Sequence, residues 1–139
     1  MSFQEKSAIA MTGALAVVYG VYFTIVAFWM TAAPVDQIGY QPLMIIVVVP
    51  LVILAAVSHI GLAVLKPKEA NQYDERDRLI SLRGEEIGGY VLAVGVFGGI
   101  VLAMAELPPF YIAHTLMLAW VLAEIVAGTT RIVLYRRGA

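Results

Sequence analysis

Four long apolar runs divide the chain, and each is long enough to cross a membrane as a helix. They cover residues 7–31, 42–65, 87–106 and 109–135. A membrane-spanning helix needs about 20 apolar residues to cross ~30 Å of hydrocarbon. The pattern therefore predicts one all-α domain over residues 1–139, an integral membrane four-helix bundle made of two helical hairpins.

The polar connections between these runs predict where the helices end. Residues 31–41 are neutral apart from Asp36, and Glu106-Leu-Pro-Pro109 is typical of a tight turn. Residues 66–86 form a long charged loop. In that loop Asp74 precedes Arg78 by four residues, the order that favours a helix, so we expect a short helix that leads through Gly84 into the third run. Pro50 is expected to kink the second run.

The distribution of basic residues predicts the orientation. Cytoplasmic loops of membrane proteins carry an excess of Lys and Arg. Here all nine basic residues fall on one side of the membrane if both chain ends are cytoplasmic: Lys6, Lys66, Lys68, Arg76, Arg78, Arg83, Arg131, Arg136 and Arg137. We therefore predict an N-in/C-in, multi-pass protein of the cell inner (plasma) membrane. Trp29 and Tyr40 suit its outer interface, and Tyr90 and Tyr135 suit its inner one.

Composition narrows the possible functions. The chain is 61% hydrophobic and 14% charged, whereas soluble domains are about 25% charged. Its net charge of −1 gives no basis for nucleic-acid binding. The absence of cysteine excludes disulfides and thiolate metal sites. No nucleophile–base constellation suggests an enzyme, so we expect no catalytic residues, no cofactor and no metal site.

Glu124 is the most informative polar residue, because ionisable side chains inside a bilayer are costly and mark functional sites by default. From the midpoint of the fourth run, Glu124 lies about 3 Å from the membrane centre on the cytoplasmic side. His59 in the second run lies at nearly the same depth, and Tyr19 lies near the centre of the first run. These three residues are the predicted intramembrane polar site. The alternative is that Glu124 makes only a structural hydrogen bond between helices.

The second histidine, His114, lies near the outer end of the fourth run. Its depth differs from that of His59 by roughly 15 Å, too far for both to ligate one haem in a single chain. Glu106 lies across the turn from His114, and we expect an exposed ion pair there or, alternatively, a proton entry point. Arg131 lies seven residues after Glu124 on the same helical face, and we expect it to reach the headgroups.

Gly95 and Gly99 in the third run form a GxxxG pair, which lets two helix backbones approach closely. Small residues also recur in the fourth run, at Ala119, Ala123 and Ala127. Two interpretations are open: the third helix packs on the fourth within one hairpin, or the glycines form a homo-oligomer interface.

The charged loop contains the sequence Asp74-Glu-Arg-Asp-Arg-Leu-Ile80, just before the glycine-rich run. Asp74, Arg76, Asp77 and Arg78 either form a solvated, self-neutralising helix or dock a cytoplasmic partner. This stretch resembles a family of small, uncharacterised prokaryotic four-span membrane proteins. The resemblance implies a four-helix fold in the inner membrane and no particular activity. The chain is also similar in size and span number to the small multidrug resistance transporters, but their essential first-span glutamate has no counterpart here.

Two functional hypotheses follow. The first is a small oligomeric carrier or channel that responds to protons or cations through Glu124 and His59. The second is a non-catalytic accessory or scaffolding subunit of a larger membrane complex. The expected partners are the lipid bilayer and either further copies of the chain or another membrane protein.

Overall fold

The computed structural model describes residues 3–50, 52–53 and 75–137, with side chains from residue 8 onward. This part of the chain is helical. Helices α1 (Phe3–Ala32), α4 (Glu75–Met104) and α5 (Pro109–Arg137) are each long and apolar enough to cross a membrane. A shorter apolar helix covers Gln41–Pro50. The remainder of the second predicted span, which contains His59, lies outside the described residues.

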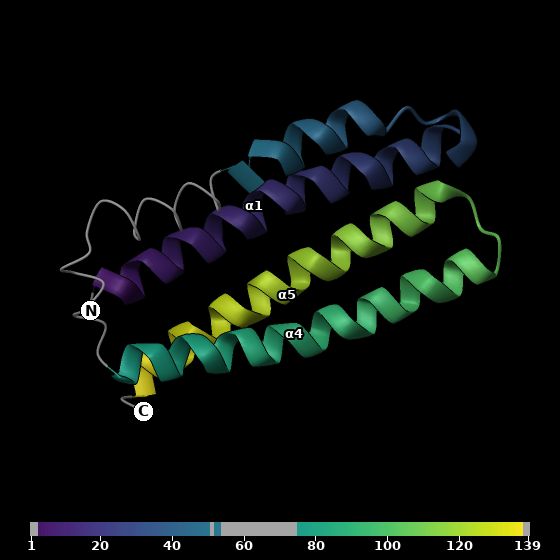
Figure 1. Ribbon diagram of the computed structural model, residues 1–139. Helices are drawn as coiled ribbons and strands as arrows, with labels where there is room; N and C mark the ends of the chain where they lie inside the picture. The colour runs from purple at the N-terminus through teal and green to yellow at the C-terminus, as the bar shows by residue number, and fades with distance from the viewer. Residues whose placement is uncertain (1–2, 51, 54–74, 138–139) are drawn as a thin grey trace.

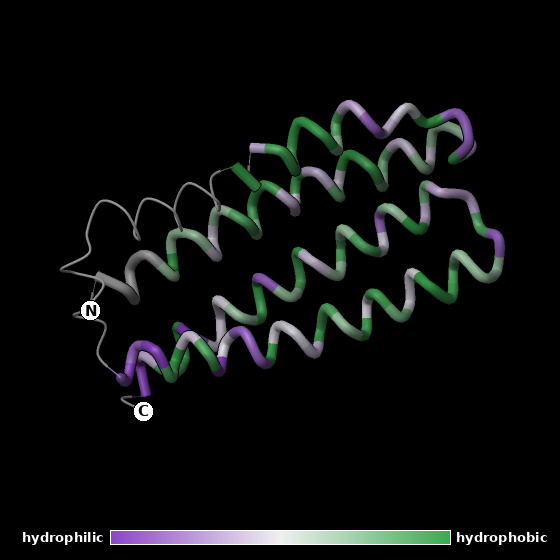
Figure 2. Tube along the Cα trace, in the orientation of Figure 1, coloured by the Kyte–Doolittle hydropathy of each residue, from purple (hydrophilic) through white to green (hydrophobic). Residues whose placement is uncertain are grey.

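Helix α5 lies between α1 and α4, and the long helices run roughly along one direction (Figure 1). The start of α1, the start of α4 and the end of α5 lie at one end of the bundle, and the turns after α1 and after α4 lie at the other (Figure 1). Polar residues gather at these two ends, while the middle of each helix is mainly apolar (Figure 2). A polar–apolar–polar distribution of this kind suits a molecule whose middle contacts hydrocarbon.

The first connection is short and ordered. After α1, a single 3-10 turn, η1 (Val35–Gln37), reverses the chain. The Gln41–Pro50 helix then returns beside α1 (Figure 1), and four of its apolar residues pack against the core: Leu43, Met44, Val47 and Val48. Pro42 lies in its first turn, where a missing backbone N–H has no cost.

The second connection is the predicted tight turn. Glu106 has φ 56°, the left-handed conformation that commonly ends a helix. Its N–H donates to Ala103 O at 3.0 Å, and the N–H of Leu107 donates to Leu102 O at 3.2 Å. These two bonds form a Schellman motif, which satisfies the last carbonyl groups of α4. Pro109 then begins α5, because its fixed φ suits a first helical residue.

Helix α4 begins inside the segment predicted as a loop. It starts at Glu75 and continues without interruption through Gly84 into the apolar span, so the short helix expected there is an extension of the span itself. Glu75 and Asp77 lie in its first turn, where carboxylates interact favourably with the positive end of the helix dipole.

Glycines of α4 lie directly against α5. A methyl group added to Gly88 would be 2.7 Å from Ala123 O and 3.0 Å from Ala127 Cβ. One added to Gly95 would overlap the Cβ of Ala119. Further along, Gly99 faces Leu116 in the same way. The GxxxG pair therefore packs within the hairpin, which is the first of the two interpretations left open by the sequence.

Because these contacts leave no room for a methyl group, Gly88→Ala should destabilise the α4–α5 hairpin by about 1–3 kcal/mol. Gly89→Ala is the matched control, since a methyl group at Gly89 meets nothing within 4 Å. There we expect unchanged or slightly higher stability, because alanine favours the helix by about 1 kcal/mol over glycine. The stability effect of each substitution is measured as the change in the free energy of unfolding in mixed micelles. Equal effects of the two substitutions would show that Gly88 is not at a tight contact.

Candidate functional site

The deepest buried polar contact joins α1 to α5 through Tyr22 and His114. The Tyr22 hydroxyl lies 3.0 Å from His114 Nε2. His114 Nδ1 lies 2.7 Å from the carbonyl oxygen of Phe110. A carbonyl oxygen only accepts, so Nδ1 carries the proton, and in the neutral ring Nε2 accepts from Tyr22. Only 1% of Tyr22 and 8% of His114 are exposed.

Aromatic rings enclose the imidazole. The Phe110 ring centre is 4.1 Å from that of His114, and the Tyr40 ring centre is 5.0 Å away. Tyr22 stacks on the same ring at 5.9 Å with an interplanar angle of 18°. Tyr40 belongs to the connection after α1, so the cluster joins the first hairpin to the second at the outer end of the bundle.

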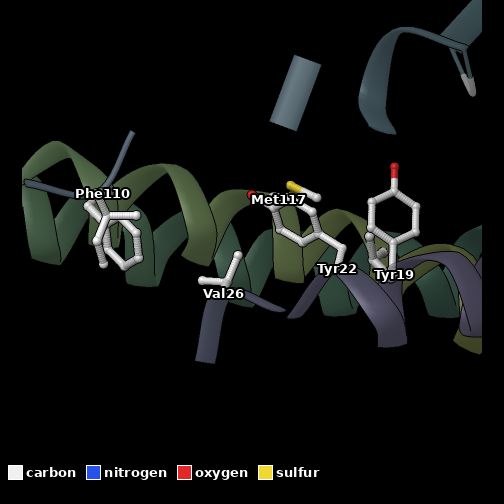
Figure 3. Packing of buried hydrophobic residues seen from close by; sticks show 7 residues of the cluster. Tyr19, Tyr22, Val26, Phe110 and Met117 are labelled. Atoms are coloured by element: carbon white, nitrogen blue, oxygen red, sulfur yellow. The ribbon is translucent and has the colours of Figure 1, made fainter. Parts of the chain in front are cut away.

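Tyr19 lies one turn before Tyr22 and is 2% exposed. The two rings stand side by side on α1 with their hydroxyl groups directed apart, near Met117 of α5 (Figure 3). Within the part of the chain that the structure describes, the Tyr19 hydroxyl has no hydrogen-bond partner. Among the described residues Tyr19 packs in the apolar core, and its membership of a polar site with Glu124 and His59 stays a prediction.

Glu124 is exposed on α5, although its neighbours Ala123 and Ala127 are buried against α4. Its carboxylate thus points out of the described helices instead of into them. The second member of the predicted pair, His59, lies outside the described residues, so the pairing of Glu124 with His59 stays a prediction.

The packing register between α4 and α5 changes the estimated depth of Glu124. The apolar part of α4, from Ile87 to Ala105, has its centre at Val96, and the adjacent Gly95 contacts Ala119. Glu124 lies five residues from Ala119, toward the end of the bundle where α4 begins, which is about 8 Å along the helix. The midpoint of the fourth apolar run gives about 3 Å instead, because α5 continues to Arg137. The depth of Glu124 in a membrane stays a prediction.

The same register places His114 five residues from Ala119 on the opposite side, also about 8 Å from the centre. His114 and Glu124 are thus at similar distances from Ala119 in opposite halves of the bundle. His114 is buried and hydrogen-bonded at both ring nitrogens, whereas Glu124 is exposed. The expected pairing of His114 with Glu106 is not seen, because Tyr22 and Phe110 occupy both nitrogens.

Charged residues near the start of α4 and the end of α5 pair with one another. Arg131 Nη2 donates to Glu85 Oε1 at 3.4 Å, which joins α5 to α4. Arg83 Nη1 donates to Glu86 Oε2 at 3.2 Å on α4. Arg131 thus pairs with Glu85, and the expected contact of Arg131 with lipid headgroups stays a prediction.

The predicted docking residues lie at the start of α4. Arg76 and Arg78 are exposed and Asp77 is half-buried, while Asp74 lies just outside the described residues. Leu79 beside them is exposed and Ile80 is buried. Ile80 therefore packs into the bundle, whereas Arg76 and Arg78 are exposed.

Neither pocket near α5 contains Glu124. One lies between α1 and α5 toward the outer turns, and the other lies along the inner half of α5 from Val126 to Leu134. Within residues 3–50, 52–53 and 75–137, no group of three or more His, Asp or Glu residues is placed to hold a metal ion. Both nitrogens of His114 already have protein partners.

Comparison with known proteins adds no relative: no family model, curated protein or solved structure matches the chain.

Sequence reasoning missed the Tyr22–His114 contact. The two residues are 92 positions apart, and nothing local in either segment indicates the other. One signal was available: Phe110, His114, Met117 and Val121 recur at intervals of three and four residues, the spacing of a single buried helix face. That spacing would have placed His114 in the core.

Removing the Tyr22 hydroxyl leaves a buried nitrogen without its donor. Tyr22→Phe should therefore lower the free energy of unfolding in micelles by about 1 kcal/mol. Thr24→Val is a suitable control on the same helix, because the Thr24 hydroxyl donates only to Gly20 O at an exposed position. We expect its effect to be within ~0.5 kcal/mol. A Tyr22→Phe variant as stable as Thr24→Val would show that the buried hydrogen bond does not stabilise the bundle.

Proposed function

We propose that this protein is a four-span, N-in/C-in membrane protein that acts as a non-catalytic accessory or scaffolding subunit of a membrane complex. Three long apolar helices and the shorter Gln41–Pro50 helix support the span count. The position of both termini and the start of α4 at one end supports an even number of crossings (Figure 1). The basic residues of α4 and α5 lie toward that end.

The observation that carries the proposal is the outward exposure of Glu124. A carboxylate about 8 Å from the membrane centre lies inside the ~30 Å hydrocarbon layer. Exposure of this group to lipid is unfavourable, so such residues generally face other protein groups or water. A donor on a neighbouring transmembrane segment removes that cost. Glu124 is therefore the proposed contact through which α5 joins an assembly.

The carrier hypothesis needs more than an exposed carboxylate. It requires a second polar group that acts with Glu124, and the predicted one, His59, lies outside the described residues. The buried polar contact between Tyr22 and His114 is closed by its own hydrogen bonds, which is typical of a structural contact between helices. The subunit proposal needs no second polar group within this chain, and for this reason we favour it.

The proposed topology is directly testable because the chain has no native cysteine. Single cysteines at Gln37 and Leu107 should react with an impermeant maleimide added to intact spheroplasts. Cysteines at Glu75 and Arg137 should react only after permeabilisation. All four replaced positions are exposed, so differences in reactivity report sidedness. Reaction of the Glu75→Cys variant in intact spheroplasts would contradict the N-in/C-in arrangement.

The subunit proposal is testable with two substitutions of Glu124. Glu124→Leu removes every hydrogen bond to a partner, so the yield of a stoichiometric partner purified from native membranes should fall roughly fivefold, as expected for ~1 kcal/mol. Glu124→Gln keeps hydrogen-bonding groups and should retain most of that yield. Glu106→Gln is the control, because this carboxylate lies in the outer turn.

Two results would contradict the subunit proposal. One is the same set of partners, in the same amounts, for wild type and Glu124→Leu. The other is proton or cation flux in liposomes that is present in wild type and lost in Glu124→Gln, which would instead establish the carrier.

A further inference from the structure

A pocket of about 250 Å³ lies between α1 and α5, and His114 is among its lining residues. Its walls include Phe23, Ala27 and Met30 from α1, and Tyr111, Thr115 and Leu118 from α5. Apart from Thr115 and the tip of Tyr111, these side chains are apolar. The His114 ring adds an aromatic surface, since both of its nitrogens are already bonded within the protein.

The position of the pocket along α5 determines what surrounds it. Its α5 residues run from Phe110 to Leu118, between the outer turn and the level of Ala119. The α4–α5 register makes Ala119 the level of the membrane centre, so this stretch spans about 12–14 Å of the outer half. The pocket therefore opens toward the hydrocarbon of the outer leaflet. All nine Lys and Arg residues belong to the other side of the proposed topology, so no basic group is available there to select an anionic headgroup.

We propose that this pocket binds one acyl chain of an outer-leaflet phospholipid. The proposal rests on the membrane insertion proposed above. At this depth no water is present to fill an apolar pocket. The side chains that line an empty pocket lack dispersion contacts on that side. A flexible hydrocarbon chain restores those contacts. Met30 favours such a ligand, because the unbranched thioether side chain adapts to irregular shapes.

The size of the pocket distinguishes a lipid chain from a protein helix. A helix with its side chains is about 10 Å in diameter, and a pocket of about 250 Å³ is too small to accept one. An acyl chain is a single row of methylene groups and fits a narrow groove between two helices. Tyr111 lies at the outer end of the lining, where an amphipathic ring suits the boundary between acyl chain and headgroup.

The test uses the full-length chain reconstituted in phosphatidylcholine vesicles that contain a photoactivatable diazirine on one acyl chain. After irradiation, peptide mass spectrometry locates the lipid adducts. We expect adducts to concentrate on Ala27, Met30, Thr115 and Leu118, even though apolar residues of α4 such as Phe97, which is 68% exposed, are more accessible to lipid.

Ala27→Phe fills the pocket and should lower these adducts about tenfold, as expected when roughly two methylene groups lose their apolar contacts. Ala16→Phe is the matched control. Ala16 is also exposed on α1 and lies eleven residues earlier, on the same helical face and about 16 Å nearer the cytoplasm. It should leave the adducts at Thr115 and Leu118 unchanged. Tyr22→Phe should leave them unchanged as well, since its hydroxyl bonds His114 outside the pocket.

Two outcomes would overturn the site. Adducts spread evenly over Phe97 and the pocket residues would show ordinary lipid contact without a binding groove. An equal loss in Ala27→Phe and Ala16→Phe would show a general disturbance of α1. Absence of adducts everywhere, Phe97 included, would instead contradict membrane insertion itself, so failure of the proposed topology is distinguishable from failure of the site.

Discussion

The close contact between α4 and α5 fixes the positions of the other features. Gly88 and Gly95 bring the α4 backbone against Ala123 and Ala119, and such contact permits one register only, because a shift by one residue would place a side chain where no space exists. That register sets the levels of all polar residues on α5. It places Arg131 beside Glu85, and in the proposed topology it puts Glu124 in the inner half and His114 in the outer half. The levels of the polar residues along α5 therefore depend on the positions of the glycines in α4.

Helix α5 uses two kinds of packing on its two sides. Toward α4 its side chains are small, so backbones meet and dispersion contacts hold the helices together. Toward α1 its side chains are large, and Met117 and Val121 pack with Tyr19 and Tyr22. One close approach on that side is at Gly128, which faces the Thr12 hydroxyl. The second interface gains its specificity from the Tyr22–His114 hydrogen bond, because a buried polar pair accepts only the arrangement that satisfies both partners.

The sequence allowed the helices to be predicted but not the relations between them. Apolar length and the residues Glu106 to Pro109 were enough to locate α4, α5 and their turn, since backbone hydrogen bonding in an apolar setting leaves helices as the stable choice. The GxxxG pair indicated a close contact without naming its partner. The level of Glu124 relative to α4 could not be read from the sequence, because it depends on the register in which the two helices pack. The Tyr22–His114 contact depends on tertiary packing between segments 92 residues apart.

The polar groups of the two halves are satisfied in different ways. In the outer half, Tyr22, His114 and the Phe110 carbonyl saturate one another within the chain. In the inner half, Glu124 is exposed, and the nearest described cation on its helical face, Arg131, is paired with Glu85. Neutral, internally bonded groups are compatible with surrounding lipid, whereas an exposed carboxylate needs another polar group. In the proposed topology the outer half can therefore contact lipid alone. In the inner half, Glu124 needs a polar partner. Assembly through the inner half and lipid binding at the outer half are compatible, because they use opposite ends of α5.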